Sequence, residues 1–155
     1  MKKCILPMII LLGMASCQQQ QAAQENAHEK VAIINVPYQE AQRYFVKNNF
    51  QEGKSEKILK NQKDFEEIFG AAAVMGKEGI PTKVDFTKSF VVAVIAPTSS
   101  NENEIKIESL QDNGKELKLN YTIVEGKDQG FSTRNTKILI LDKKSDKPVV
   151  FQEVK

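Results

Sequence analysis

The chain has 155 residues, of which 41% are hydrophobic and 27% charged, and this length and composition suit one globular domain with one core. Its 22 lysines and arginines nearly balance its 20 aspartates and glutamates, which gives a formal net charge of +2. With two cysteines and one histidine, the sequence offers few groups for thiol or imidazole chemistry.

The N-terminus has the features of an export signal. It begins MKKCILPMIILLGMASC, with two lysines, an apolar run over Ile5–Leu12 and small residues before Cys17. The apolar run is too short for a transmembrane helix. The segment resembles the signals of bacterial lipoproteins, in which the residue matching Cys17 is lipidated and becomes the mature N-terminus. The alternative is a plain secretory signal that is cut near Ala15.

We therefore expect a signal peptide over residues 1–16 and a lipid anchor at Cys17. In lipoproteins of this type an Asp after the lipidated Cys retains the protein at the inner membrane. Gln18 stands there, which favours an anchor in the outer membrane. Residues 17–30 then form a lipid-anchored flexible tether with a reach of about 20 Å, and residues 31–155 form the single folded domain.

Export limits the chemistry of the folded domain. Cys4 leaves with the signal and Cys17 carries lipid, so disulfides, thiol catalysis and cysteine-based metal sites are excluded. The only histidine, His28, lies in the tether, where we expect it to be solvated. Loss of Lys2 and Lys3 leaves a mature chain without net charge, which gives no electrostatic surface for nucleic acid.

Two helices are expected in the first half of the domain. Pro37–Asn48 predicts a short helix, because Pro suits the first helical position and apolar residues recur at helical spacing. Its end, Tyr44–Phe50, is also compatible with a strand. The second helix begins after Asn61, a good N-cap, and ends at Gly70, with Phe65, Ile68 and Phe69 on its apolar face.

After Pro81 the pattern changes to strands. Phe90–Ala96 is a continuous apolar run, as in a central strand that is covered on both faces. Alternating strands follow on either side of Asp112-Asn113-Gly114, a strong hairpin signal. A last pair of strands is expected over Lys137–Asp142 and Val149–Val154. We therefore predict an α+β fold, in which an antiparallel meander of about five strands carries one or two N-terminal helices on one face.

The motifs that would carry catalysis or bind metal are weak. Without His or Cys in the domain a hydrolytic triad is excluded, and no S-x-x-K spacing supports a Ser–Lys pair. Asn101–Glu104 lacks the spaced ligands and central Gly of a calcium loop and is expected to be a polar hairpin tip. The sequence therefore predicts a protein that is not an enzyme and has no metal or cofactor.

One stretch, GAAAVMGKEGIPT over residues 70–82, resembles a phosphate-binding loop. Lys77 is followed by Glu78 instead of Ser or Thr, and the stretch is expected to follow a helix instead of a strand. An exported protein also meets little nucleoside triphosphate. We therefore expect no nucleotide partner and interpret the stretch as a connection from a helix to the central strand.

Two segments are candidates for contact with a partner. The first contains Met75, Gly76, Gly79, Ile80 and Pro81, and its apolar tip either covers the core or binds another molecule. The second is GKDQGFSTRNT, residues 126–136, in which Phe131 and Arg134 are of types enriched at binding hot spots. The alternative for the second segment is a solvated loop whose Phe points inward.

Several of these motifs together suggest a family. DFEEIFG (64–70), VDFTKSFVVAVIA (84–96), IKIESL (105–110) and KILILDKK with PVVF resemble the C-terminal domain of PrcB-type protease-complex lipoproteins. The chain is also similar to small Bacteroidetes-type lipoproteins of unassigned function. The resemblance covers residues 44–153 and implies a partner protease but no catalytic residues. Asn103-Glu104 stand where the PrcB family has a Gly-Gly-Tyr loop.

From these features we expect a lipid-anchored envelope protein that is a non-catalytic protein-binding module. Its partners would be the membrane, through the lipid, and another envelope protein. The resemblance implies a protease-associated or protease-modulating subunit. Two alternatives remain open at this stage: a small-ligand carrier with an apolar cavity between helix and sheet, and a Ser–Lys hydrolase.

Overall fold

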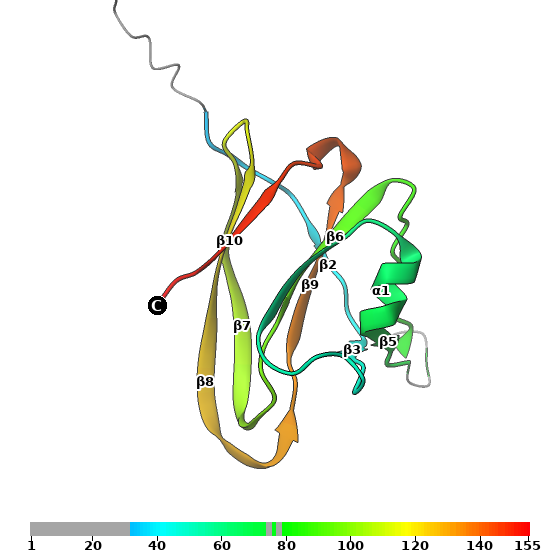
Figure 1. The fold of residues 1–155 in the computed structure, drawn as a ribbon, viewed down its shortest axis with the longest axis vertical. Helices are drawn as coiled ribbons and strands as arrows, with labels where there is room; N and C mark the ends of the chain where they lie inside the picture. Colours follow the sequence, from blue (N-terminus) through cyan, green and yellow to red (C-terminus); the bar gives the residue numbers. More distant parts are fainter. Residues whose placement is uncertain (1–31, 74–75, 77–78) are drawn as a thin grey trace, which may run out of the picture. The chain divides into compact units, whose positions relative to one another are not determined.

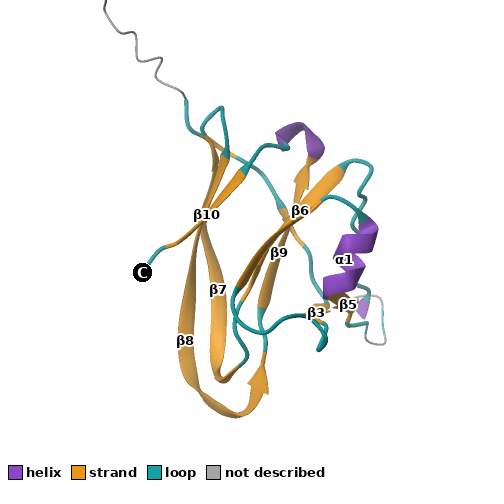
Figure 2. Cartoon of the chain, viewed as in Figure 1, coloured by secondary structure: helices purple, strands orange, loops and turns teal. Residues whose placement is uncertain are grey.

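The computed structural model describes residues 32–73, 76 and 79–155, and Val31–Lys155 form one compact unit. The expected signal peptide, the tether and Cys17 lie outside the described residues, as do Met75, Lys77 and Glu78. Strands predominate, as Figure 2 shows.

The elements follow one another from the N-terminus to the C-terminus in Figure 1. In chain order they are β1 (Ile34–Asn35), β2 (Gln39–Glu40), β3 (Tyr44–Val46), β4 (Ser55–Leu59), α1 (Gln62–Ile68), β5 (Phe69–Ala71), β6 (Ser89–Ile95), β7 (Ser99–Asp112), β8 (Leu117–Thr133), β9 (Thr136–Asp142), the 3-10 helix η2 (Lys143–Ser145) and β10 (Val149–Glu153).

The strands form two four-stranded sheets and one small sheet. The first, sheet A, has the order β1-β7-β8-β10, and the second, sheet B, has the order β2-β9-β6-β4. Strands β3 and β5 pair separately. All pairs are antiparallel except β10 with β8, which run parallel.

Sheets A and B pack face to face around the main core. Because side chains alternate between the two faces of a strand, every second residue of β8 points inward. Leu117, Leu119 and Tyr121 are fully buried there. They belong to one cluster with Phe90 and Val92 of sheet B.

A second core lies on the other face of sheet B. Val91, Ala93 and Ile95 of β6 point to that side, where Phe65 of α1 and Phe69 cover them. Sheet B is therefore buried on both faces, which explains the continuous apolar run of β6. The expected central strand is confirmed.

Two further local predictions are confirmed. Helix α1 begins after Asn61, whose side-chain oxygen accepts a hydrogen bond from the Asp64 N–H at 2.9 Å. The turn between β7 and β8 contains Asn113 and Gly114, and Gly114 has a φ of 87°, in the region that favours glycine. The helix ends at Ile68, two residues before Gly70, which lies in β5.

The expected fold class, α+β with a five-stranded antiparallel meander, is wrong. The described residues form a mainly β structure with two four-stranded sheets, and α1 is the single α-helix among them. Val149–Glu153 does not pair with Thr136–Asp142 as expected. It crosses to sheet A and pairs with β8 in parallel, because β9 is already flanked by β6 and β2 in sheet B.

The helix expected over Pro37–Asn48 is also wrong. Gln39–Glu40 pairs with β9 and Tyr44–Val46 pairs with β5, so the strand alternative for the end of this segment is the correct one. Arg43, between these strands, has a φ of 66°, which a continuous right-handed helix does not allow. The apolar residues at helical spacing in this segment therefore do not form one helix face, because its two strands pair with different partners, β9 and β5.

Candidate functional site

Strand β7 has a free edge over most of its length. It pairs with β8 along one side, but on the other side β1 reaches only Gln111 and Asp112. The Val36 N–H then donates to the Leu110 carbonyl oxygen at 2.9 Å. The next residue, Pro37, has no N–H to continue the pairing, and the chain crosses to sheet B. Among the described residues, no strand flanks Ser99–Ser109 on this side.

A groove of about 390 Å³ runs along this free edge. It is lined by Glu104–Glu108 of β7 together with Tyr38, Glu40 and Lys137. Ile105 is buried in the main core and Ile107 packs against it, whereas Tyr38 is 42% exposed. Across the groove from β7, Lys137 Nζ lies 2.7 Å from Glu40 Oε1. The groove therefore combines apolar side chains, charged walls and an open strand edge.

The first candidate segment, residues 70–82, leads from β5 toward β6. Ile80 is 72% exposed, so its side chain faces solvent and does not cover the core. Gly79 is buried, and its N–H donates to the Gly76 carbonyl oxygen at 3.0 Å. Gly76 has a φ of 107°, which side chains rarely adopt. Pro81 is partly buried next to Ile80.

The segment that resembles a phosphate-binding loop, residues 70–82, was expected to follow a helix directly, and the structure differs. The segment follows strand β5 and not the helix directly, because α1 ends at Ile68. The next strand along the chain is β6, and no α-helix stands between β5 and β6 among the residues that the structure describes, whereas a phosphate-binding loop leads into a helix. Lys77 and Glu78 lie outside the described residues.

The second candidate segment is not a loop. Gly126–Thr133 belongs to β8, where Asp128 lies opposite Asn101 and Thr133 opposite Ser99 of β7. Asn101–Glu104, expected to be a hairpin tip, lies within strand β7, so that expectation is wrong. This polar ribbon lies at the end opposite the Asn113 turn (Figure 1). Phe131 is 61% exposed, so it points outward instead of tucking into the core.

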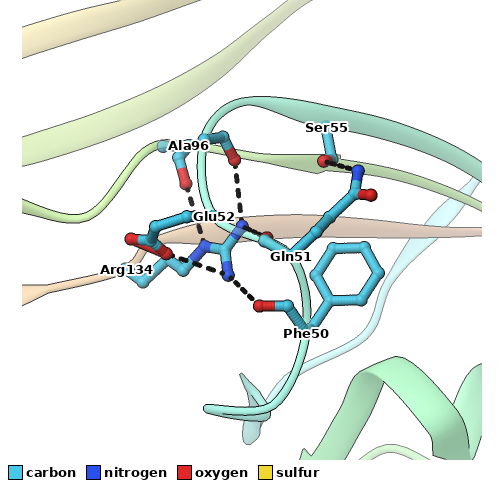
Figure 3. Close-up of polar contacts among 7 residues, drawn as sticks. Phe50, Gln51, Glu52, Ser55, Ala96 and Arg134 are labelled. Atoms are coloured by element: carbon cyan, nitrogen blue, oxygen red, sulfur yellow. Dashed lines mark hydrogen bonds and ion pairs between the residues drawn. The ribbon is translucent and has the colours of Figure 1, made fainter.

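Arg134, in contrast, points into the protein (Figure 3). Its side chain is only 11% exposed. The guanidinium donates to backbone carbonyl oxygens at four places, listed here with their distances: Gln51 (2.6 Å), Gly53 (2.9 Å), Phe50 (3.4 Å) and Ala96 (3.4 Å).

These contacts give Arg134 a structural role, because they hold the 50–53 loop in place. The guanidinium also lies 3.5 Å from Glu52 Oε2 and 5.5 Å from the centre of the Phe50 ring. A guanidinium has five N–H groups, and its partners in the 50–53 loop and at the end of β6 engage all three of its nitrogen atoms. The residue thus fixes this loop to the β8–β9 connection and presents no free donor to a partner.

A smaller cleft of about 330 Å³ lies beside Arg134. Phe45–Asn48 form one wall and Ser132–Arg134 the other, with Glu52 and Thr98 between them. Phe45 is 48% exposed. A Cβ atom on Gly70 would clash with the Phe45 ring, so the glycine lets this ring lie against β5.

Lys54 and Ser99 line one hollow of about 450 Å³ and are the pair to which the Ser–Lys alternative applies. Lys54 Nζ lies 2.7 Å from Glu153 Oε2, and this hydrogen bond raises the pKa of Lys54 above its usual value. A general-base lysine needs a lowered pKa so that the amine is neutral. Lys54 is therefore an ammonium ion that cannot activate the Ser99 hydroxyl.

The carrier alternative requires an apolar cavity between helix and sheet. That space is filled by aromatic rings: the Phe65 centroid lies 5.0 Å from that of Tyr44, 5.1 Å from that of Phe69 and 5.7 Å from that of Phe86. The hollow of about 1000 Å³ beside α1 is an open groove instead. Most of the residues that line it are polar or charged, and Phe50, Leu59 and Ile68 are its apolar members.

No helix among the described residues is long and apolar enough to cross a bilayer. The same part of the chain contains no group of three or more His, Cys, Asp or Glu side chains arranged to hold a metal ion.

The free edge of β7 was not found from the sequence. Its one signal was Pro37, which we interpreted as the first residue of a helix. Comparisons with protein families, curated proteins and solved structures give no match. The candidate site therefore depends on the geometry alone.

Proposed function

We propose that this protein is a lipid-anchored, non-catalytic module of the cell envelope that binds another protein along the free edge of β7. The observation that carries the proposal is the unflanked edge of Ser99–Ser109 with the groove beside it. An unpaired edge presents backbone N–H and C=O groups that an extended segment of another chain can pair with.

The edge is also protected against uncontrolled pairing. The pairing of β7 with β8 is irregular between Ser99 and Asn103 and again between Ile107 and Ser109. Charged side chains alternate along the strand at Glu104, Lys106 and Glu108. Bulges and charges of this kind reduce non-specific aggregation at sheet edges. Regular pairing remains over Asn103–Ile107, which is long enough for a short strand.

A binding role agrees with the chemistry of the domain. Residues 32–155 contain no histidine and no cysteine, and Lys54, which lines the same hollow as Ser99, is held as an ammonium ion by Glu153. The resemblance of residues 44–153 to PrcB-type lipoproteins supports a protease as the partner. The N-terminal signal and Cys17 support attachment to the outer membrane.

Site-specific photo-crosslinking in intact cells tests this function. A photoreactive amino acid replaces Lys106 on the free edge, or Lys63 on α1 as the matched control, since both lysines are exposed. We expect one discrete protein adduct from position 106 and none from position 63. Probes at Ile80 and Phe131 cover the other exposed apolar positions. If neither position 106 nor position 80 nor position 131 gives an adduct, a protein-binding function is contradicted.

A further inference from the structure

The free edge of β7 is acidic. Its exposed charged side chains are Glu102, Glu104 and Glu108 against the single Lys106. Lys106 Nζ lies 3.4 Å from Glu104 Oε2 and offsets that charge in part. Within the described residues no ion pair joins Glu102 or Glu108 to a basic side chain. Glu108 accepts a hydrogen bond from the Thr122 hydroxyl at 3.2 Å.

Side chains of β7 alternate between the core and the solvent-facing side of sheet A, and the charged ones lie on the solvent-facing side. Ile105 and Ile107 point toward the core, so Glu104 and Lys106 lie on the solvent-facing side of sheet A. Glu108 lies on that side as well, because it contacts Thr122, the residue opposite Lys106. A strand added to this edge would meet carboxylates with its outward side chains and the groove beside Ile107 and Tyr38 with its inward ones.

We propose that the occupant of this edge is an extended basic segment of another protein, with lysine or arginine at alternate outward positions and apolar side chains between them. This inference rests on the protein-binding function proposed above and names the chemistry of the partner. Opposite charges directly across two strands stabilise their pairing, and like charges destabilise it. The two carboxylates of Glu104 and Glu108 therefore select a basic strand over an acidic one.

The same charges disfavour a second copy of this chain as the occupant. Pairing of two β7 edges would bring six carboxylates from Glu102, Glu104 and Glu108 together with two ammonium groups from Lys106. The excess of like charge opposes such a dimer. A basic segment meets the same backbone groups without this repulsion.

Synthetic peptides test the inference on the detergent-solubilised full-length chain. The probe is a nine-residue peptide in which valine alternates with lysine. Its first counterpart has glutamate for lysine, and its second has methylated backbone nitrogens at alternate positions. We expect about tenfold tighter binding of the lysine peptide than of the glutamate peptide, the range that two cross-strand charge pairs supply. The methylated peptide should bind at least about tenfold more weakly, because it loses donors to the strand edge.

Protein variants locate the site of binding. Glu104→Lys with Glu108→Lys should reverse the preference between the two peptides, whereas Glu66→Lys with Glu67→Lys on α1 makes the same charge change elsewhere and should leave it unaltered. Amide hydrogen exchange should slow at Glu104–Ser109 when the lysine peptide is bound. High salt should reduce the preference, because these charges are exposed.

The failures of the two proposals are distinguishable. Equal binding of the lysine and glutamate peptides, with slowed exchange at Glu104–Ser109, would overturn the basic partner but not the function of the edge. If no peptide slows exchange there while the photo-adduct at position 106 persists, strand addition is wrong and protein binding survives. An adduct between two copies of this chain would identify a self-pairing edge and overturn the inference.

Discussion

The Tyr121 hydroxyl donates a hydrogen bond to Glu56 Oε1 at 2.5 Å and so joins sheet A to sheet B. Tyr121 is fully buried in β8, and Glu56 lies on β4, the outer strand of the other sheet. Lys54 Nζ lies 5.9 Å from the centre of the Tyr121 ring and pairs with Glu153 of β10. These contacts link the outer strands β4 and β10, whereas β7 on the other side of the sandwich has a free edge.

Replacement Tyr121→Phe should lower the free energy of unfolding by about 1.5–3 kcal/mol, the net contribution of a hydrogen bond to a charged acceptor. The ring stays in place, so the loss reports the hydroxyl alone. Urea unfolding followed by circular dichroism measures it. Tyr38→Phe is the control, because Tyr38 is 42% exposed. A Tyr121→Phe variant as stable as the wild type would show that this bond adds nothing to the sandwich.

The same tyrosine gives a pH dependence. Burial, followed by the hydrogen bond to Glu56, raises the pKa of Tyr121 to about 12 from an unfolded value of 10.0. A raised folded pKa favours the protonated form, so its stabilising effect is complete below pH 10 and is lost as the pH rises toward 12. We expect the wild type to lose more stability than Tyr121→Phe between pH 10 and 12. Urea unfolding across that range measures the difference, and parallel losses in both proteins would contradict the prediction.

Arg134 should contribute strongly to stability, because it holds the 50–53 loop through hydrogen bonds to its carbonyl oxygens. Arg134→Lys removes the planar arrangement of donors that reaches Gln51 and Gly53 at once, and we expect it to cost at least about 2 kcal/mol of the free energy of unfolding. Phe131→Ser is the matched control three residues away; it should change stability by no more than about 0.5 kcal/mol because Phe131 is exposed. Equal stability of the two variants would show that Arg134 is not structural. Chemical unfolding of both variants decides this.

The elements with a strong local signal were predictable. The run Phe90–Ala96 identifies a strand buried on both faces, and Asn61 identifies the start of α1 by its capping side chain. Strands of two or three residues, such as Gln39–Glu40, have too few residues to show a period of two. The polar ends of β7 and β8, which contain Asn101–Glu104 and Gly126–Thr133, have the composition of loops because no core lies beneath them.

The remaining differences between the expected fold and the structure come from pairing between residues far apart in the sequence. Nothing local in Val149–Glu153 indicates that it pairs with β8 instead of β9, since both neighbours satisfy the same alternating pattern. Phe131 is exposed, so the alternative in which its side chain points inward is wrong. The role of Arg134 depends on carbonyl groups about 80 residues away along the chain, which no local pattern indicates. The free edge of β7 exists because the chain turns away after Val36, and the sequence shows only a proline there.

The lipid anchor gives the last prediction. Cys17→Ala should abolish incorporation of labelled palmitate into the protein, whereas Cys4→Ala should leave it unchanged, because Cys4 lies within the expected signal peptide. Each buried methylene of a lipid chain contributes about 0.8 kcal/mol to membrane binding, so loss of the lipid should also release a processed chain from the membrane fraction. The measurement is gel fluorescence of the labelled protein with cell fractionation. A wild-type chain that carries no label would instead support a plain secretory signal cut near Ala15, and the β7 edge would then act in a protein without an anchor.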